Sequence, residues 1–426
     1  MGRTHTIRIP VHGFVEFDDW ERDIINHPVF QRLRRIRQLA FSEHVYPGSV
    51  HTRFEHSLGV MHVASRLFDA LCRNLSAATK EIVGKTKADR ERNRKLLRLA
   101  ALLHDVGHGP LSHGAEIFAP MSEDGTKLKH EHFSLALIRE KMDCVITNHS
   151  AGECLSITAK DIAELYQDGS EAVTPVTSAL RSLVNGELDA DRMDYLLRDA
   201  HHCGVPYGQF DLERIIDTIR VEKARNRESK ILLSSNGLHS AEQLILARFM
   251  MFVGVYFHKT RVACDIHSAE CLKGLLEDRF NKPLLPDPST GEGRDSFLSL
   301  DDWTLYQWVA DSKCDHAKAL REHRQFKRVH FTPERPDQNH IDDLDRLTDI
   351  LDKRSIEYRC ETATKSWYKP ISPSSVFVWD EDTSKPVPLP NRSAILAGLD
   401  PIDQRMVFVW PKDLDAAKEA KDSVLS

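Results

Sequence analysis

Residues 103–113, LHDVGHGPLSH, collect side chains that can do chemistry at the end of an apolar helical run. Three histidines and one aspartate stand among two glycines and a proline. Imidazole and carboxylate groups are metal ligands because their donor atoms are neutral or anionic near pH 7. The segment therefore predicts a metal site where this helix ends.

Two further candidate ligands lie elsewhere in the chain. His56 and Asp191 each begin a segment of helical character, and with the adjacent pair His104 and Asp105 they complete an H…HD…D pattern. Neighbouring helical residues point about 100° apart, so one ion can reach both only between helices. We expect one divalent ion there: Mn, Fe, Co, Ni or Zn, and less naturally Mg.

A lone histidine on an apolar helical face is more often a core or surface residue than a ligand. Here eight of the 22 histidines fall between residues 51 and 132, and glycines follow the His-Asp pair directly. The whole pattern favours the metal site over the structural alternative. His51 and His62 are left unassigned. His132 is either exposed or contacts the side chains that hold the metal.

Composition bounds the class of protein. The 426 residues are 41% apolar, which is enough to bury a sizeable core, and no apolar run approaches the length of a membrane span. A net charge of −6 argues against bulk attraction to nucleic acid or anionic membrane. The eight cysteines lack any C-x-x-C pair, and the N-terminus lacks the apolar stretch of a secretory signal. We expect free thiols and a cytoplasmic protein.

Apolar periodicity predicts a mainly helical body. The charged segment 79–98 is expected to form an exposed loop leading into a helix. Short strands are expected at 5–17 and 230–235. Helices are expected at 18–40, 56–75, 95–107, 131–142, 159–167, 187–200 and 239–260.

The tail has a different character. KRVHF, IEYRCET and SVFVWDE predict short strands, and residues 340–354 predict a helix between the first two. We place a boundary near residue 325. This gives a helical body, 1–325, with the metal core at about 50–200, and a small α+β C-terminal region, 326–426.

Four motifs in the sequence resemble those of a known protein family. HTRFEHSLGV, LLHDVGHGPLSH, KHEH and LDADRMDYLLRDAHHCGV are similar to motifs of the HD-domain phosphohydrolases. The resemblance is greatest to the deoxynucleoside triphosphate (dNTP) triphosphohydrolase branch, which holds the SAM-and-HD-domain dNTPases and bacterial dGTPases. It covers roughly residues 8–265 and implies an all-helical HD core, a homo-oligomer and, in some members, an allosteric nucleotide.

The resemblance also assigns catalytic positions near the α-phosphate. His113 and His130 look like the catalytic histidines of the family, and the turn at Gly107 and Gly109 would bring His108 to the metal. Glu116 follows His113 by three residues and can orient it, although related enzymes often have Asp there. The structural alternative for His108 and His113 is helix capping or surface exposure.

The remaining candidates would hold the substrate. In the resembled enzymes a Tyr excludes a 2′-hydroxyl, a carboxylate and an amide bind the 3′-hydroxyl, and a second Tyr packs on the sugar. Those positions match Tyr195, Asp199, Gln38 and Tyr256 in that order. A triphosphate is strongly negative, so basic side chains must lie together at its binding site. The alternative for each basic residue is a solvated position on a helix. The candidates are Arg53, Arg192, Arg248, His258 and Lys259.

The sequence thus predicts metal-dependent hydrolysis of dNTPs to deoxynucleoside and inorganic triphosphate. One alternative is an HD phosphohydrolase acting on nucleoside monophosphates, cyclic nucleotides or guanosine polyphosphates. A second is a non-catalytic nucleotide or nucleic-acid binder using the basic stretch 80–98, where interleaved acids and absent aromatics weaken the nucleic-acid signal.

Overall fold

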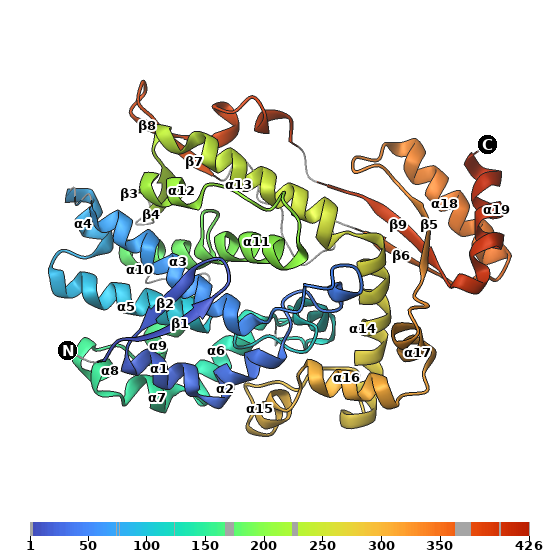
Figure 1. Cartoon of the computed structure of the whole chain (residues 1–426), viewed down its shortest axis with the longest axis horizontal. Helices are drawn as coiled ribbons and strands as arrows, with labels where there is room; N and C mark the ends of the chain where they lie inside the picture. The colour runs from blue at the N-terminus through green and yellow to red at the C-terminus, as the bar shows by residue number, and fades with distance from the viewer. Residues whose placement is uncertain are drawn as a thin grey trace.

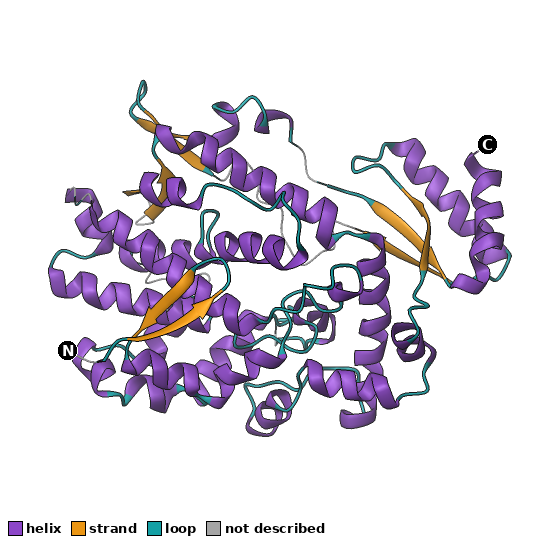
Figure 2. Ribbon diagram, in the orientation of Figure 1, coloured by secondary structure: helices purple, strands orange, loops and turns teal. Residues whose placement is uncertain are grey.

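Helices form most of the protein, as the sequence predicts for a mainly α HD core with a small α+β region (Figure 2). The computed structural model describes residues 3–73, 75, 77–122, 124–166, 174–223, 229–362, 376–399 and 402–425. Residues 167 and 375, at the edges of an expected helix and an expected strand, lie outside these ranges. The helices are α1 (Asp19–Asn26), α2 (Pro28–Gln31), α3 (Arg53–Arg73), α4 (Ala77–Val83), α5 (Lys87–Leu103), α6 (His130–Glu140), α7 (Asp143–Thr147), α8 (Ser150–Leu155), α9 (Ala159–Glu164), α10 (Pro175–Asn185), α11 (Ala190–Cys203), α12 (Leu212–Thr218), α13 (Leu238–Met251), α14 (Lys259–Phe280), α15 (Gly291–Leu298), α16 (Asp302–Asp311), α17 (Asp315–Arg321), α18 (Gln338–Lys353) and α19 (Leu414–Leu425).

Helices α3, α5 and α11 pack together at the centre of the body (Figure 1). Along α3, Val60, Val63, Ala64 and Leu67 recur at helical spacing and are fully buried. The burial of this stripe fixes the rotation of α3 about its axis. That rotation sets the direction in which the polar residues near its N-terminus point.

The charged segment 79–98 shows where the sequence prediction was wrong. It is helical in α4 and again from Lys87, because Thr86 and Asp89 form a reciprocal N-terminal capping box at the start of α5. Arg98 is buried rather than exposed, since its guanidinium makes paired hydrogen bonds of 2.6 and 2.9 Å with Glu21. Charge density alone did not reveal this long-range partner.

Among the described residues, three small sheets accompany the helices. The N-terminal hairpin pairs β1 (His5–Ile9) with β2 (Gly13–Phe17). The C-terminal sheet has the order β5-β9-β6 and packs against α18 and α19 (Figure 1). Its strands are β5 (Lys327–Phe331), β9 (Arg405–Val409) and β6 (Tyr358–Thr362).

The segment 376–399 leaves the C-terminal region and returns to the body. The third sheet, of order β3-β4-β7-β8, joins body strands β3 (Ile219–Lys223) and β4 (Ser229–Leu233) to β7 (Phe377–Asp380) and β8 (Lys385–Pro388). Val376 and Val378 are buried in the main core. The strand expected in SVFVWDE is therefore present but belongs to a body sheet. We keep the division of the chain near residue 325 as a proposal. In it, residues 376–399 of the C-terminal region pack with the body.

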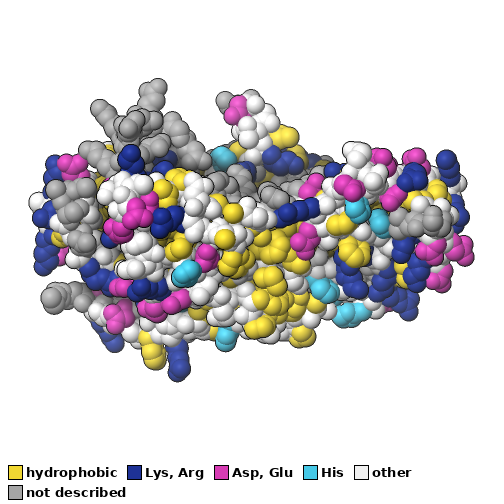
Figure 3. Space-filling model, turned by 90° about the horizontal axis from the view of Figure 1, so that it is seen from above, with side chains coloured by type: hydrophobic (Ala, Val, Ile, Leu, Met, Phe, Trp, Pro, Cys, Tyr) yellow, Lys and Arg dark blue, Asp and Glu magenta, His cyan; other side chains and the backbone are white. Residues whose placement is uncertain are grey.

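One face of the molecule carries a concentration of apolar side chains. Seen from above, hydrophobic side chains gather near the middle, with more charged side chains toward the ends (Figure 3).

Among the described residues, no single helix is both long and apolar enough to cross a membrane. The pair Ser235–Tyr256 and Lys259–Phe280, bent by 65°, meets that test only as two pieces taken together.

Candidate metal centre and histidine cluster

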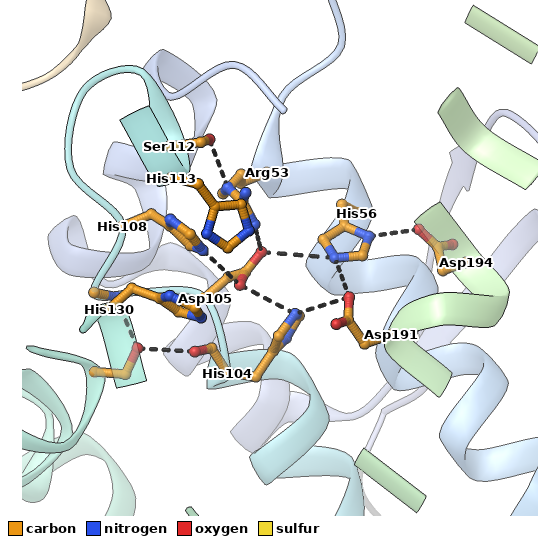
Figure 4. Close-up of polar contacts among 12 residues, drawn as sticks. Arg53, His56, His104, Asp105, His108, Ser112, His113, His130, Asp191 and Asp194 are labelled. Atoms are coloured by element: carbon orange, nitrogen blue, oxygen red, sulfur yellow. Dashed lines mark hydrogen bonds and ion pairs between the residues drawn. The ribbon is translucent and has the colours of Figure 1, made fainter. Parts of the chain in front are cut away.

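The four predicted metal ligands converge from the ends of three helices (Figure 4). His56 lies in the first turn of α3, and Asp191 lies in the first turn of α11. His104 directly follows the last residue of α5, and Asp105 begins the turn after it. Helix packing therefore gathers side chains that are up to 135 residues apart in the sequence.

Their donor atoms lie at spacings that suit a shared ion. His56 Nε2 is 2.9 Å from Asp191 Oδ1 and 3.6 Å from Asp105 Oδ2, and His104 Nε2 is 3.2 Å from Asp105 Oδ1. Ligand atoms bound about 2.1 Å from one ion lie roughly 3.0–3.5 Å apart. The Nε2 atoms of His56 and His104 are buried and make no hydrogen bond with any residue that the structure describes. The residues present therefore fit a divalent metal ion.

The opposite face of each imidazole is already engaged. His56 Nδ1 lies 2.7 Å from Asp194 Oδ2, and His104 Nδ1 lies 2.8 Å from the carbonyl oxygen of Ala101. Because those acceptors take the Nδ1 protons, each Nε2 keeps a lone pair for the metal. Arg53 donates to Asp105 and, together with His104, holds the pKa of this carboxyl well below its ordinary value against the effect of burial.

Asp194 and its partners are functional residues that the sequence reasoning missed. Arg198 holds the carboxylate with two hydrogen bonds of 2.8 Å, and His12 Nε2 lies 2.7 Å from Oδ1. Gly59 makes this arrangement fit, since an added Cβ would lie 1.9 Å from Asp194 Oδ1. Asp194 could have been suspected because it follows Asp191 by about one helical turn. His12, 182 residues away, gave no such signal.

The predicted catalytic residues form a second cluster beside the metal centre. The ring of His108 stacks on that of His130 at 3.9 Å between centroids, and Glu116 Oε1 lies 3.2 Å from His113 Nδ1 and 2.5 Å from His130 Nδ1. His108 Nε2 is 3.2 Å from Asp105 Oδ1. One carboxylate therefore orients two histidines, and a third histidine connects them to the metal ligands.

The charges in this cluster are unequal. Burial would lower the pKa of His130, but Glu131 and Glu116 outweigh it and raise that pKa to about 9. Burial lowers the pKa of His108 and of His113 below their ordinary value. Glu116 is buried too, yet hydrogen bonds from His113 and His130 place its pKa well below the usual range. At neutral pH the cluster thus holds one imidazolium and two neutral imidazoles.

The turn between the two clusters has unusual backbone geometry. Leu111 and Ser112 both have left-handed φ values, 64° and 54°. This conformation lets Ser112 Oγ accept from Arg53 Nε at 2.7 Å and donate to the carbonyl of Arg37 at 2.6 Å. At Gly107 an added Cβ would lie 2.2 Å from the backbone nitrogen of Ser134, so only glycine allows α6 to approach and present His130.

The predicted phosphate-binding cations are placed unequally. Arg53 and Arg248 are buried, and Nη2 of the first and Nε and Nη1 of the second make no hydrogen bond. Arg192 is held by Asp189 instead. Lys259 is exposed at the start of α14, which His258 caps through its ring. The structure thus points to Arg53 and Arg248 more than to the other candidates.

The predicted sugar-binding residues lie in a buried polar group. Asp199 lies 2.7 Å from Tyr256, whose hydroxyl donates to Oδ2, and 2.7 Å from His51 Nε2. Gln38 Oε1 is buried and has no hydrogen-bond partner within the described ranges. Burial raises the pKa of Tyr195 to about 12 against the nearby cations Arg248 and Arg192. His51, which the sequence left unassigned, therefore positions Asp199.

Comparison with known proteins identifies two regions of the chain. The HD domain matches residues 53–196, and the HD associated region matches residues 210–347. Uncharacterized protein YwfO of Bacillus subtilis is 36% identical over 263 residues, which are 60% of this chain and 52% of that protein. Deoxynucleoside triphosphate triphosphohydrolase SAMHD1 of Bos taurus is 32% identical over 359 residues, covering 72% and 59% of the two chains.

A solved structure of a hypothetical protein from Aquifex aeolicus is similar to 98% of this chain and 100% of its own, with a TM-score of 0.77 and 27% identity. The chain spans about half the length of the curated relatives it matches. These similarities confirm the resemblance seen in the motifs. Residues 53–196 are therefore an HD domain, and an HD associated region follows it at residues 210–347.

Proposed function

We propose that the chain is a metal-dependent phosphohydrolase that cleaves dNTPs to deoxynucleoside and inorganic triphosphate. The observation that carries the proposal is the contact between the two clusters. His56, His104 and Asp105 form one donor set, which Asp191 joins through its 2.9 Å contact with His56, and Asp105 also lies 3.2 Å from His108 in the His108–His113–Glu116–His130 cluster. Lewis-acid and acid–base groups can thus act on one phosphate.

The chain's own groups have distinct tasks in this reaction. His56, His104, Asp105 and Asp191 would hold a divalent ion, which when bound would polarise a phosphoryl oxygen. Water attacks the α-phosphorus and the bond from that phosphorus to the 5′-oxygen breaks, so the leaving oxygen requires a proton. The protonated His130, linked to His113 through Glu116, is the store of that proton. Arg53 and Arg248 can offset the charge of the phosphates.

Preference for deoxyribose rests on the buried group around Asp199. Tyr195 follows Asp191 by one helical turn, so it lies next to the metal along α11. Asp199 is one turn further and is fixed by Tyr256 and His51. Gln38 Oε1 is buried and unpaired among the described residues, so this amide is available to a ligand. A Tyr closing on C2′ excludes a 2′-hydroxyl, while Asp199 accepts the single hydrogen bond that the 3′-hydroxyl donates and the Gln38 amide N–H donates to its oxygen.

A product assay tests the proposal. The protein is offered the four dNTPs and four NTPs with Mn²⁺, singly and mixed, and products are separated by ion-exchange chromatography. Deoxynucleoside and triphosphate are expected, with loss of both in His104→Ala and Asp105→Ala and normal activity in His201→Ala, an exposed histidine on α11. Turnover of monophosphates, cyclic nucleotides or guanosine polyphosphates alone would replace this proposal by another phosphohydrolase. Nucleotide binding without any turnover would indicate a non-catalytic binder.

Four further features are proposed on the same basis: manganese as one metal that supports activity, a homo-oligomer, an allosteric nucleotide and a cytoplasmic location. Activity only in nucleotide mixtures would support the allosteric nucleotide. Metal analysis of the protein as isolated, light scattering and cell fractionation test the other three.

A further inference from the structure

A cavity of about 290 Å³ lies where the body meets the C-terminal sheet. Gln38, His113 and Tyr256 of the body line it, and so do Thr362 of β6 and Met406 of β9. Helix α14 runs between the body and this sheet (Figure 1). The cavity is thus built by two regions of the chain and is close to the lower limit of small-molecule sites, roughly 300 Å³.

The contact that closes the cavity is apolar and well packed. Val262 and Ile266 of α14 form a hydrophobic cluster with Phe326, Met406 and Phe408. Phe257 adds a buried aromatic ring to the lining. A flat, partly apolar ligand can be held between such side chains, since bases stack favourably on aromatic rings.

One carboxylate in this cavity lacks hydrogen-bond donors. Asp265 lines the cavity with 36% of its side chain exposed, and Arg261 Nη2 is 3.3 Å from Oδ2. Arg261 directs its other nitrogens to Ser42 and to the carbonyl of Tyr256. In the part of the chain that the structure describes, no group donates a hydrogen bond to the Asp265 carboxylate. Asp265 is partly exposed, and the carboxylate oxygens that Arg261 does not engage can therefore accept hydrogen bonds from a ligand in the cavity.

The position of the cavity indicates which part of a ligand would enter it. In the proposed function His113 faces the α-phosphate, and Gln38 and Tyr256 hold the sugar. All three also line this cavity. The group attached to the far side of the sugar is the base, so it would extend toward α14 and the C-terminal strands.

We propose that this cavity receives the nucleobase of the substrate and that Asp265 selects guanine, with the C-terminal strands β6 and β9 completing the pocket. The inference rests on the proposed function and names the substrate within it. A guanine base presents N1–H and a 2-amino group side by side, so one carboxylate can accept both hydrogen bonds. Adenine and cytosine offer an unprotonated ring nitrogen beside their amino group, and thymine offers one N–H between two carbonyls.

Deoxyinosine triphosphate (dITP) provides a test that needs no variant, because it lacks only the 2-amino group of dGTP. We expect kcat/KM for dGTP to exceed that for dITP about tenfold or more, the usual effect of a hydrogen bond to a charged group. Asp265→Asn should abolish this ratio. Glu277→Gln, a matched change at an exposed position of α14, should preserve it. Equal rates for dGTP and dITP in the unchanged protein, or a ratio that survives Asp265→Asn, would overturn the inference.

Binding measurements separate this inference from the proposed function. Kd for dGTP and dITP is measured by calorimetry in a Glu116→Gln background, where turnover is slow. Hydrolysis of all dNTPs at equal rates, with equal Kd values, would overturn the base selection and leave the proposed function intact. Tenfold tighter binding of dGTP without any hydrolysis would support the base pocket and overturn the proposed function.

Discussion

Gly59→Ala tests whether the close approach of α3 to α11 holds the metal centre together. By helix propensity alone, alanine in the middle of α3 would stabilise the protein by about 1 kcal/mol. The new Cβ, however, would lie 1.9 Å from Asp194 Oδ1 and 2.5 Å from Arg198 Nη2, well inside van der Waals contact. Asp194 and Arg198 must separate to admit it.

Separation of this buried pair costs about 3–5 kcal/mol, which exceeds the propensity gain. We therefore expect Gly59→Ala to lower the free energy of unfolding by about 2–4 kcal/mol. Because Asp194 also orients His56 through its 2.7 Å contact, metal affinity should fall about 10–100-fold. Urea unfolding of the metal-stripped protein and calorimetric titration with Mn²⁺ measure the two effects.

Gly291→Ala is the matched control, since nothing lies within 4 Å of the Cβ it would add. Its unfolding free energy should stay within about 0.5 kcal/mol of the unchanged protein. A Gly59→Ala protein that is as stable as the original, and binds Mn²⁺ equally well, would refute the reasoning.

Three further predictions concern acid stability, catalysis and sugar selection. Burial raises the pKa of Glu21, but Arg98 and Lys95 outweigh it and lower that pKa to about 2, below the ordinary 4.5. The carboxylate therefore contributes about 3 kcal/mol to the free energy of unfolding above pH 4.5, and this contribution is lost as pH falls toward 2. Glu21→Gln should thus lower the urea midpoint at pH 7 much more than at pH 3. An equal loss at both pH values would contradict this. Glu116→Gln should reduce kcat about 10²–10⁴-fold with little change in KM, since it releases His113 and His130; an unchanged kcat would exclude Glu116 from catalysis. Tyr195→Ala should raise kcat/KM for NTPs relative to dNTPs, measured with matched bases, whereas an unchanged ratio would remove Tyr195 from sugar selection.

The sequence predicted those parts of the site that depend on local rules. The end of an apolar run before His104 and the helix that starts near Asp191 follow from periodicity and capping, and the structure has both. His108, His113 and His130 lie together because glycines allow the chain to turn and α6 to approach. The mainly helical fold was predictable for the same reasons.

The long-range partners were not predictable from local rules. Nothing near His12 indicates Asp194, and nothing in segment 79–98 indicates that Glu21 will bury Arg98. The parallel pairing of β4 with β7 joins Leu233 to Val378, and strand propensity does not specify a partner so far along the chain. Such pairings depend on the packing of the whole fold.

The most direct test of the account is hydrolysis of dGTP in ¹⁸O-labelled water with product analysis by mass spectrometry. Attack of water on the α-phosphorus predicts one ¹⁸O atom in the triphosphate and none in the deoxynucleoside, with no product in His104→Ala. Labelled monophosphate or orthophosphate, or undiminished turnover in His104→Ala, would contradict the proposed reaction at this centre.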